Sequence, residues 1–273
     1  MEAKTTGPVT RERELNKATV RVLHVLSSFA SEASGFSMTE LALALGMTKS
    51  MTYRALTTLV EQGYLVRERD GSRYQLGYRV LELQNPLVAE PDLRTLSAPY
   101  RLRLHTVTGE STGLVVRAAD HCVLIEGLET RKPGVWRVRA GAVYPLFGPA
   151  SGRVILAYDP DEAIDAYIGR HVPMHDPRSG EVLEPEVLKR QIALIREQGF
   201  AWVERAAQPQ IVSLAFPIFD IDGRLHGSIS VGGPRARVEA QLKHQLPELQ
   251  ELVAELNKRT RLFPADDAGS ELS

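Results

Sequence analysis

Five side chains between residues 49 and 57 combine positive charge and hydroxyl groups, with no carboxylate among them. They are Lys49, Ser50, Tyr53, Arg54 and Thr57. In a helix the last four occupy positions i, i+3, i+4 and i+7, so they share one face, and Lys49 lies beside them in the first turn. Such a face offers hydrogen-bond donors to phosphates and base edges and brings no negative charge towards a phosphate backbone. Arg54 is the best candidate for a base contact, because a guanidinium can pair bidentately with guanine.

The alternative interpretation of this face is a plain solvated helix or a protein-interaction surface. A solvated face normally mixes both signs of charge. The whole chain has a net charge of −1, but residues 41–79 contain six basic and three acidic residues and carry +3, which leaves −4 for the rest. This local excess of positive charge favours double-stranded DNA as the partner.

Residues that could support an enzyme or a metal site are few. The sequence G-P-A-S-G (residues 148–152) places its serine one position too late for the G-x-S-x-G elbow of hydrolases. His171 and His175 are four apart, but Pro173 between them prevents a regular helix face. We therefore expect no catalytic residues, no metal and no cofactor.

The composition is that of an ordinary globular protein with one large or two medium domains. The chain has 273 residues, 43% of them hydrophobic and 25% charged. Cys122 is the only cysteine, so no intrachain disulfide is possible, and a buried, inert thiol is expected. No apolar run approaches the roughly 20 residues of a membrane helix, and the first residues lack the apolar core of a signal peptide. We expect a cytoplasmic protein that has no membrane partner.

Two predicted helices precede the basic one. Asn16 begins a stretch in which apolar residues recur every third position and form one stripe. These residues are Val20, Leu23, Leu26 and Phe29. The sequence S-M-T-E (residues 37–40) then has the form of a capping box and opens a short helix that Gly46 can end.

The basic helix itself is predicted from Thr48, a suitable N-cap, to Gly63, with Leu56, Leu59 and Val60 on its inner face. Extended runs at residues 64–69 and 73–76 flank an Asp-Gly pair, which is a strong hairpin signal. Three helices followed by a hairpin predict a winged helix-turn-helix over residues 13–77, whose third helix enters the major groove. Arg69 and Arg73 beside the wing tip, and Thr39 in the second helix, complete the predicted DNA contacts.

The rest of the chain predicts a linker at residues 78–91 and an α+β domain at residues 92–263. The linker has a short helix, and then Asn85, Pro86 and Pro91 interrupt regular structure. The second domain is expected to hold a mostly antiparallel sheet with helices against it. Expected strands are residues 111–119, 122–128, 135–140, 211–219 and 225–231, and expected helices are residues 92–107, 150–158, 161–168, 185–198 and 239–262.

Several of these segments resemble a known family. G-M-T-K-S-M-T-Y-R-A-L-T-T-L-V-E-Q-G-Y-L (residues 46–65) resembles the DNA-binding domain of the IclR (isocitrate lyase regulator) family of bacterial transcription factors. G-A-V-Y-P-L-F-G-P-A-S-G-R (residues 141–153) resembles the family's loop motif, which is Pro-Leu, three residues, Ala, one residue, then Gly-Lys. A-F-P-I-F-D-I-D-G-R (residues 215–224) and S-V-G-G-P (residues 230–234) resemble its hairpin and closing motifs. The motifs follow the family's order and spacing from about residue 14 to residue 262.

The resemblance implies a GAF-like effector-binding domain, a homodimer built through the DNA-binding domains and linker, and often a homotetramer. It implies that a small organic acid changes the occupancy of operator DNA and thereby regulates a catabolic operon, and we expect a repressor. Two alternatives stay open. The C-terminal domain could be an enzyme that reports to the helix-turn-helix, or the protein could bind DNA without any ligand.

The chain departs from the family's pattern around the expected pocket. Arg153 replaces the usual Lys, Phe147 replaces a polar residue that is often His, and Pro149 replaces a Thr. Q-I-V-S (residues 210–213) stands where many members have Gly-Val-x-Cys. These differences predict a drier pocket, whose ligand need not be that of the best-known members.

The pocket loop opens a predicted helix, whose free N–H groups form an anion site. We expect a carboxylate to lie on Gly148, Ala150 and Ser151. Small or hydroxylated residues on two strands are expected to form a pocket wall, because the period of two gives each pair one face. They are Ser213 with Ala215, and Ser228 with Ser230. Trp136 and Phe147 could add an aromatic wall, which favours an aromatic or otherwise bulky acid; the alternative is that each serine is an ordinary strand residue.

Overall fold

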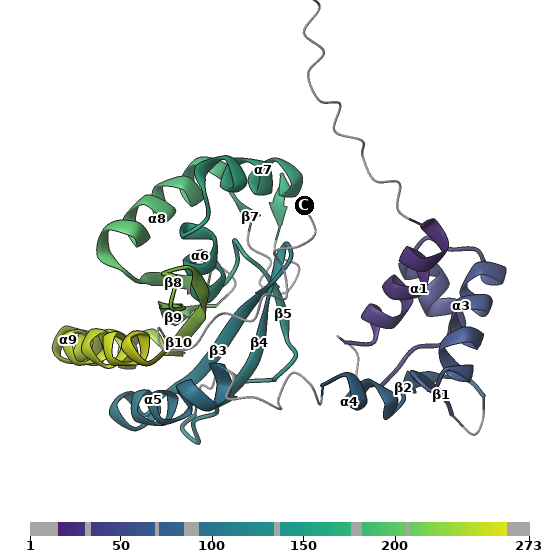
Figure 1. Cartoon of the computed structure of the whole chain (residues 1–273), viewed down its shortest axis with the longest axis horizontal. Helices are drawn as coiled ribbons and strands as arrows, with labels where there is room; N and C mark the ends of the chain where they lie inside the picture. The colour runs from purple at the N-terminus through teal and green to yellow at the C-terminus, as the bar shows by residue number, and fades with distance from the viewer. Residues whose placement is uncertain are drawn as a thin grey trace, which may run out of the picture. The chain divides into compact units, whose positions relative to one another are not determined.

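The computed structural model describes residues 16–30, 34–68, 71–84, 93–133, 137–175, 182–205 and 208–260. The chain divides into two compact units, Met1–Ala89 and Glu90–Ser273 (Figure 1). No helix in the described parts of the chain is long and apolar enough to cross a membrane.

The first unit contains three helices, a two-stranded hairpin and a further short helix. In order these are α1 (Lys17–Ser28), α2 (Met38–Ala44), α3 (Lys49–Glu61), β1 (Leu65–Arg67), β2 (Tyr74–Leu76) and α4 (Arg79–Gln84). The strands pair antiparallel, with Val66 opposite Gln75. The predicted helix-turn-helix order, with a hairpin behind it, is confirmed.

Side-chain caps set the helix starts in this unit. The Asn16 side chain accepts from the amides of α1, and Thr48 Oγ1 accepts from the Met51 N–H at 3.3 Å. The predicted capping box is complete: Glu40 donates its N–H to Ser37 Oγ, and the Ser37 N–H donates to Glu40 Oε2 at 2.7 Å. That backbone hydrogen bond lowers the pKa of the Glu40 carboxyl, so the box stays ionised and closed at neutral pH.

The predicted apolar stripe of α1 is wrong at one position. Leu23 is 54% exposed, whereas Val25 is buried and Val22 packs partly buried against the core of this unit. The buried face runs through residues 22, 25, 26 and 29, which is the i, i+3, i+4, i+7 pattern of a helix that packs on one side. Spacing by threes alone drifts round the helix and selected Leu23 in error.

The second unit is built on a six-stranded antiparallel sheet of order β5-β4-β3-β10-β9-β8. Its strands are β3 (Ser111–Ala118), β4 (His121–Leu128), β5 (Val143–Pro145), β8 (Ala201–Arg205), β9 (Gln208–Phe219) and β10 (Leu225–Pro234). A separate small hairpin joins β6 (Met174–His175) to β7 (Val182–Leu183). The α+β prediction is confirmed. The predicted strand at residues 135–140 is wrong over its described part, since residues 137–140 form no strand. The edge of the sheet is instead formed by β5, which follows in the sequence.

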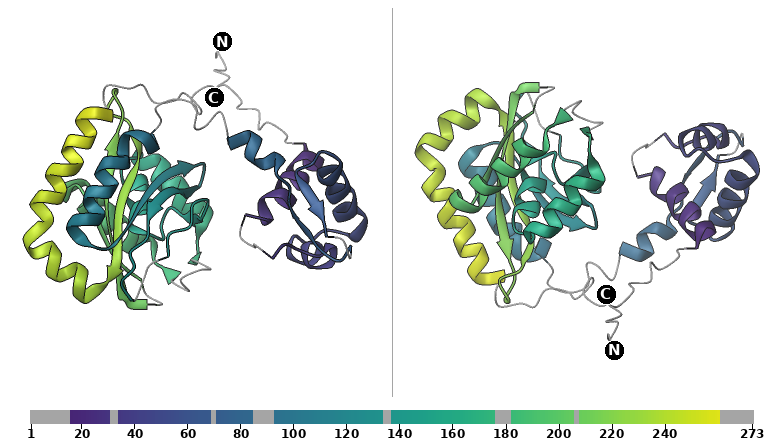
Figure 2. Two further views of the ribbon diagram at one scale, coloured as in Figure 1. Left: turned by 90° about the horizontal axis from the view of Figure 1, so that it is seen from below. Right: turned by 90° about the horizontal axis from the view of Figure 1, so that it is seen from above.

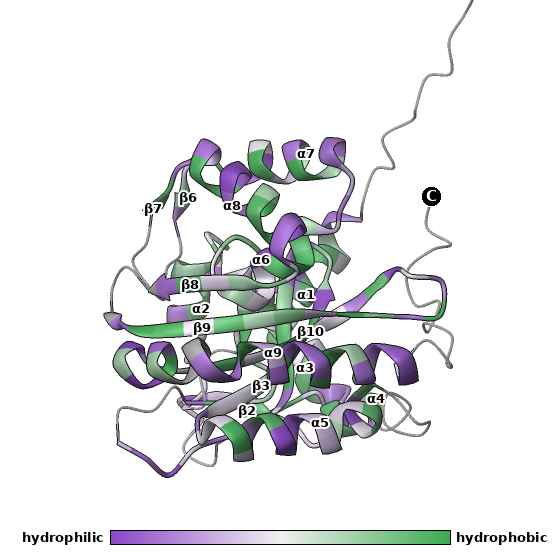
Figure 3. Ribbon diagram, turned by 90° about the vertical axis from the view of Figure 1, so that its left-hand side faces the viewer, coloured by the Kyte–Doolittle hydropathy of each residue, from purple (hydrophilic) through white to green (hydrophobic). Residues whose placement is uncertain are grey.

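Helices cover both faces of this sheet, as Figures 1 and 2 show. Helices α5 (Leu93–Thr108) and α9 (Arg235–Thr260) pack on one face, where Leu214, Phe216 and Ile218 point into a shared core as predicted. Helices α6 (Ala150–Ala157), α7 (Asp161–His171) and α8 (Pro185–Gln198) form the other layer, whose core includes Ala215. In Figure 3 the central strands are largely hydrophobic, and the outer helices carry hydrophilic stretches.

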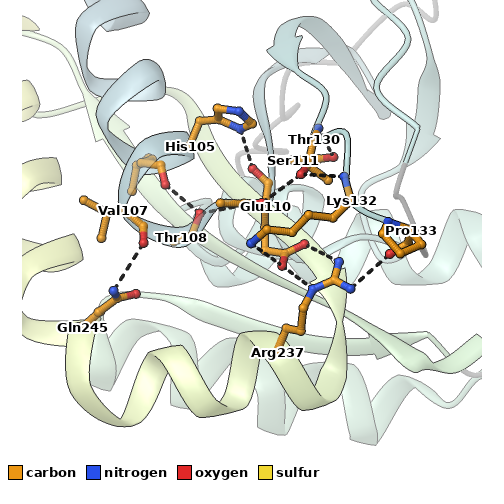
Figure 4. Close-up of polar contacts among 12 residues, drawn as sticks. His105, Val107, Thr108, Glu110, Ser111, Thr130, Lys132, Pro133, Arg237 and Gln245 are labelled. Atoms are coloured by element: carbon orange, nitrogen blue, oxygen red, sulfur yellow. Dashed lines mark hydrogen bonds and ion pairs between the residues drawn. The ribbon is translucent and has the colours of Figure 1, made fainter.

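A buried carboxylate joins the ends of several of these elements (Figure 4). Glu110, between α5 and β3, is 0% exposed and receives two hydrogen bonds from Arg237 in the first turn of α9, at 2.6 and 2.9 Å. Lys132 Nζ lies 3.8 Å from the same carboxylate, and Arg237 also donates to the Pro133 carbonyl. This group, the Glu110 cluster, ties the start of the last helix to the loop after β4.

Candidate DNA-binding and effector-binding sites

Helix α3 has one buried and one exposed face. Leu56 and Leu59 are buried in the core of the first unit, and Val60 packs against it. The predicted reading-face residues lie opposite: the first four are exposed and the last is half-buried. They are Lys49, Ser50, Tyr53, Arg54 and Thr57. The fold therefore presents the basic, hydroxylated side of α3 to solvent, and the helix's one acid, Glu61, lies in its last turn.

Two of the remaining predicted contacts can be placed. Thr39 is exposed in the first turn of α2, while Arg69 lies outside the described residues. Arg73 is turned into its own domain: its Nη2 donates to the Gly35 carbonyl at 2.6 Å and its Nε to the Ser34 carbonyl at 3.1 Å. It also pairs with Glu40 at 3.3 Å. These contacts fasten the wing to the segment before α2.

The wing contains a basic residue that sequence reasoning missed. Arg67, at the end of β1, is exposed, and its Nε donates to the Gly71 carbonyl at 2.9 Å. Its guanidinium carbon lies 5.6 Å from the ring centre of Tyr74, a cation–π geometry. The signal was available in the sequence, because Arg67 precedes the Asp-Gly turn by three residues.

The Arg73 contacts predict a stability effect. Arg73→Ala should lower the free energy of unfolding of the protein by about 1–3 kcal/mol, the usual range for losing hydrogen bonds to a charged group. Denaturant unfolding followed by circular dichroism measures it. Arg21→Ala, which removes an exposed arginine of α1, is the matched control and should leave stability near the wild-type value. Equal unfolding curves for Arg73→Ala and the wild type would contradict the structural role of Arg73.

The predicted effector loop lies at the start of α6, within the core of the second unit. Phe147, Ala150 and Ser151 are all buried. Pro149 is the N-cap of α6 and supplies no side-chain hydrogen bond, which leaves the first amides of that helix without a side-chain cap. The Gly148 N–H, however, donates to the Pro145 carbonyl at 3.1 Å in a tight turn. Of the three predicted anion donors, one is thus used inside the loop.

The predicted strand wall faces α6. Ser228 is buried, and its hydroxyl donates to the Ser151 carbonyl in the first turn of α6, at 3.2 Å. Ser230 is also buried and donates to the Gly113 carbonyl at 3.3 Å. Ala215 pairs with Ser230 across β9 and β10 and therefore shares its face, and Ser213 follows by the period of two. The structure brings these four side chains to the α6 side of the sheet; the predicted Trp136 lies outside the described residues.

Side chains of α7 contact the loop, and sequence reasoning gave them no role in effector binding. Tyr167 is buried, and its hydroxyl accepts from the Leu146 N–H at 2.9 Å. Burial raises the pKa of Tyr167 to about 12, so the hydroxyl stays protonated at neutral pH. Its ring stacks on His171, with centroids 4.1 Å apart, and His171 also meets Phe147 edge-on at 6.5 Å. These aromatic contacts form one side of the loop.

An ion pair closes the far side of this aromatic group. Arg170 donates to both carboxylate oxygens of Asp120, at 2.9 and 3.0 Å, and lies next to His171 in α7. The Arg170 hydrogen bond lowers the pKa of Asp120, so the carboxylate is ionised at neutral pH. His171 Nε2 lies 4.0 Å from the same carboxylate. The tip of the β3–β4 hairpin is thus fixed to α7.

Comparisons with known proteins agree with both units. The model of the IclR helix-turn-helix domain matches residues 18–69, and the model of the bacterial transcriptional regulator IclR C-terminal domain matches residues 86–258. The chain is 27% identical over 238 residues to the HTH-type transcriptional regulator KipR of Bacillus subtilis, covering 87% of this chain and 93% of KipR. It is 25% identical over 253 residues to the DNA-binding transcriptional repressor YiaJ of Escherichia coli, covering 91% and 88% of the two chains.

A solved structure shares the fold. It is an IclR homolog from Microbacterium hydrocarbonoxydans complexed with 4-hydroxybenzoate, with a TM-score of 0.72 and 22% identity, covering 90% of this chain and all of the other. The two domain models together span most of the sequence, in the order in which the helix-turn-helix and the six-stranded sheet occur. The chain belongs to the IclR family of bacterial transcriptional regulators.

Proposed function

We propose that this chain is a ligand-responsive repressor of a catabolic operon, which binds operator DNA as a homodimer or homotetramer and changes its occupancy when a small organic acid binds. The observation that carries the DNA-binding part is the exposed face of α3 from Lys49 to Thr57, which bears no carboxylate. Phosphates and base edges need donors of this kind. Repression is supported by the similarity to the repressor YiaJ.

Two features support an aromatic acid as the effector. The first amides of α6 have no side-chain cap, and a helix N-terminus favours a carboxylate. Next to them Phe147 meets His171 edge-on and His171 stacks on Tyr167, so aromatic side chains adjoin the predicted anion site. The Microbacterium protein of the same fold binds 4-hydroxybenzoate, an acid of this class.

Assembly through the first unit is supported by apolar side chains that face solvent. Tyr78 is 89% exposed, and Leu81 and Leu83 of α4 and Leu23 of α1 are more than half exposed. Large apolar side chains that face solvent are typical of surfaces that pair with a second copy. Two recognition helices about one turn of DNA apart would then read a roughly palindromic operator.

A mobility-shift assay with the DNA upstream of the chain's own gene tests the proposal. We expect a shift at low salt that one acid from a panel of benzoate, 4-hydroxybenzoate and aliphatic acids weakens. The same acid at a hundredfold excess over its Kd should stabilise the protein by about 2.7 kcal/mol, because it binds only the folded state. Thermal unfolding with and without the acid measures this stabilisation, with acetate as the control.

Two results would contradict the proposal separately. Failure of folded protein to shift the DNA at low salt would remove the DNA-binding part. A clear shift together with no stabilising acid would favour a DNA-binding protein that has no ligand.

A further inference from the structure

The two-residue segment Leu146-Phe147 is held at both ends by buried side chains. Tyr167 of α7 accepts from the Leu146 N–H at 2.9 Å, and Arg153 of α6 donates from Nε to the Phe147 carbonyl at 2.6 Å. Both side chains are nearly inaccessible to solvent, with 0% and 2% exposure. Hydrogen bonds in such surroundings are well ordered, because water does not compete for their partners. The direction of the Phe147 peptide is thus set by its neighbours.

Arg153 also connects this segment to a third element. Its Nη1 donates to Gln191 Oε1 on α8 at 2.7 Å. The planar guanidinium fixes the angle between its donors, so the position of Gln191 helps to determine where Nε points. The lysine that is common at this position in the IclR family has a single ammonium nitrogen on a flexible stem and cannot impose a fixed angle between two donors. Arginine here makes α8 part of the support of the loop.

The first turn of α6 lies directly on the same loop. A Cβ added to Gly152 would come within 2.5 Å of the Leu146 carbonyl oxygen, closer than atoms can pack. Only glycine allows this approach, so the Leu146 carbonyl lies directly against the first turn of α6. Any shift of the Leu146–Phe147 peptide therefore moves the N-terminus of α6 with it.

We infer that Arg153 and Gln191 are a positioning pair that holds Phe147 and the N-terminus of α6 in the geometry required for the acid effector, so that α8 sets effector affinity without lining the site. The inference rests on the proposed effector function. A site held in advance by its neighbours binds more tightly, because less order has to be created on binding. Loss of the pair should weaken binding of the acid and leave the separate DNA-binding unit unaffected.

The test compares three substitutions on α8 in the full-length protein. Gln191→Leu removes the oxygen that Arg153 binds, whereas Gln191→Glu keeps it. Gln198→Leu is the matched control, because it removes a glutamine hydrogen bond from the same helix, to the Phe200 carbonyl at 2.7 Å, away from the loop. Isothermal titration with the panel of benzoate, 4-hydroxybenzoate and aliphatic acids gives the Kd, and mobility shifts without acid give operator affinity.

We expect Gln191→Leu to raise the Kd of the acid about tenfold, which corresponds to the loss of one positioning hydrogen bond. Gln191→Glu and Gln198→Leu should have a Kd for the acid within about twofold of the wild-type value. All three variants should bind operator with equal affinity when no acid is present. Equal acid affinity in Gln191→Leu and the wild type would overturn the positioning role. So would equal losses in Gln191→Leu and Gln198→Leu, which would indicate general loosening of α8. A wild-type protein that binds no acid would instead contradict the proposed effector function, and the positioning role with it.

Discussion

Arg54→Ala is expected to weaken sequence-specific operator binding and to leave the fold intact. Arg54 is exposed on α3, so its side chain contributes little to the core of the first unit. If its guanidinium pairs with guanine, losing it removes about 1–3 kcal/mol of discrimination, or roughly five- to 150-fold in affinity for the specific site. Mobility shifts with the upstream DNA, in the presence of excess non-specific DNA, measure the change.

Two controls separate base reading from charge. Arg54→Lys keeps the positive charge but loses the bidentate geometry, so it should retain non-specific binding and its salt dependence while losing preference for the operator. Arg190→Ala removes an exposed arginine from α8 in the other unit and should bind operator as the wild type does. Native affinity in Arg54→Ala would mean that another part of α3 or the wing reads the bases.

The first unit could be predicted almost completely, because its signals are local. Ser37 with Glu40, Thr48 before α3, and the Asp-Gly turn each depend on residues within four positions of one another. Arg73 shows the limit of such reasoning. Its partners at Ser34 and Gly35 lie 39 and 38 residues away, so the sequence could show its charge but not its direction.

The surroundings of the proposed effector site could be predicted only in outline. Alternation along β9 and β10 correctly separated the face that packs on α5 and α9 from the face that packs on α6, because period two is a backbone property. Tyr167 contacts the loop from 21 residues away, Gln191 reaches it only through Arg153, 38 residues before it in the chain, and both belong to ordinary amphipathic helices. Strands β5 and β8 escaped prediction for a related reason: three and five residues are too short to show a period, and pairing with neighbours defines them.

Glu110→Ala is expected to destabilise the second unit strongly. The Glu110 carboxylate is fully buried, and the substitution leaves Arg237 and Lys132 facing each other without their anion (Figure 4). Breaking a buried pair from one side costs about 3–5 kcal/mol, and the 31% exposure of the Arg237 side chain places the expected loss near the lower end. Denaturant unfolding measures it. The control is Asp165→Ala, which breaks the exposed pair with Lys189 and should change stability little.

Gly233 supplies a sharper test of the same cluster. A Cβ at Gly233 would overlap Glu110 Oε2, and the carboxylate cannot turn aside while Arg237 holds both of its oxygens. Gly233→Ala should therefore be costly in the wild type. In the Glu110→Ala background the obstructing carboxylate is gone, so the double variant should be less destabilised than the sum of the two single variants. Additive losses would show that Gly233 is required for its backbone alone. A coupling of about 1 kcal/mol or more would mean that this glycine of the closing S-V-G-G-P motif is required by the carboxylate that packs against it.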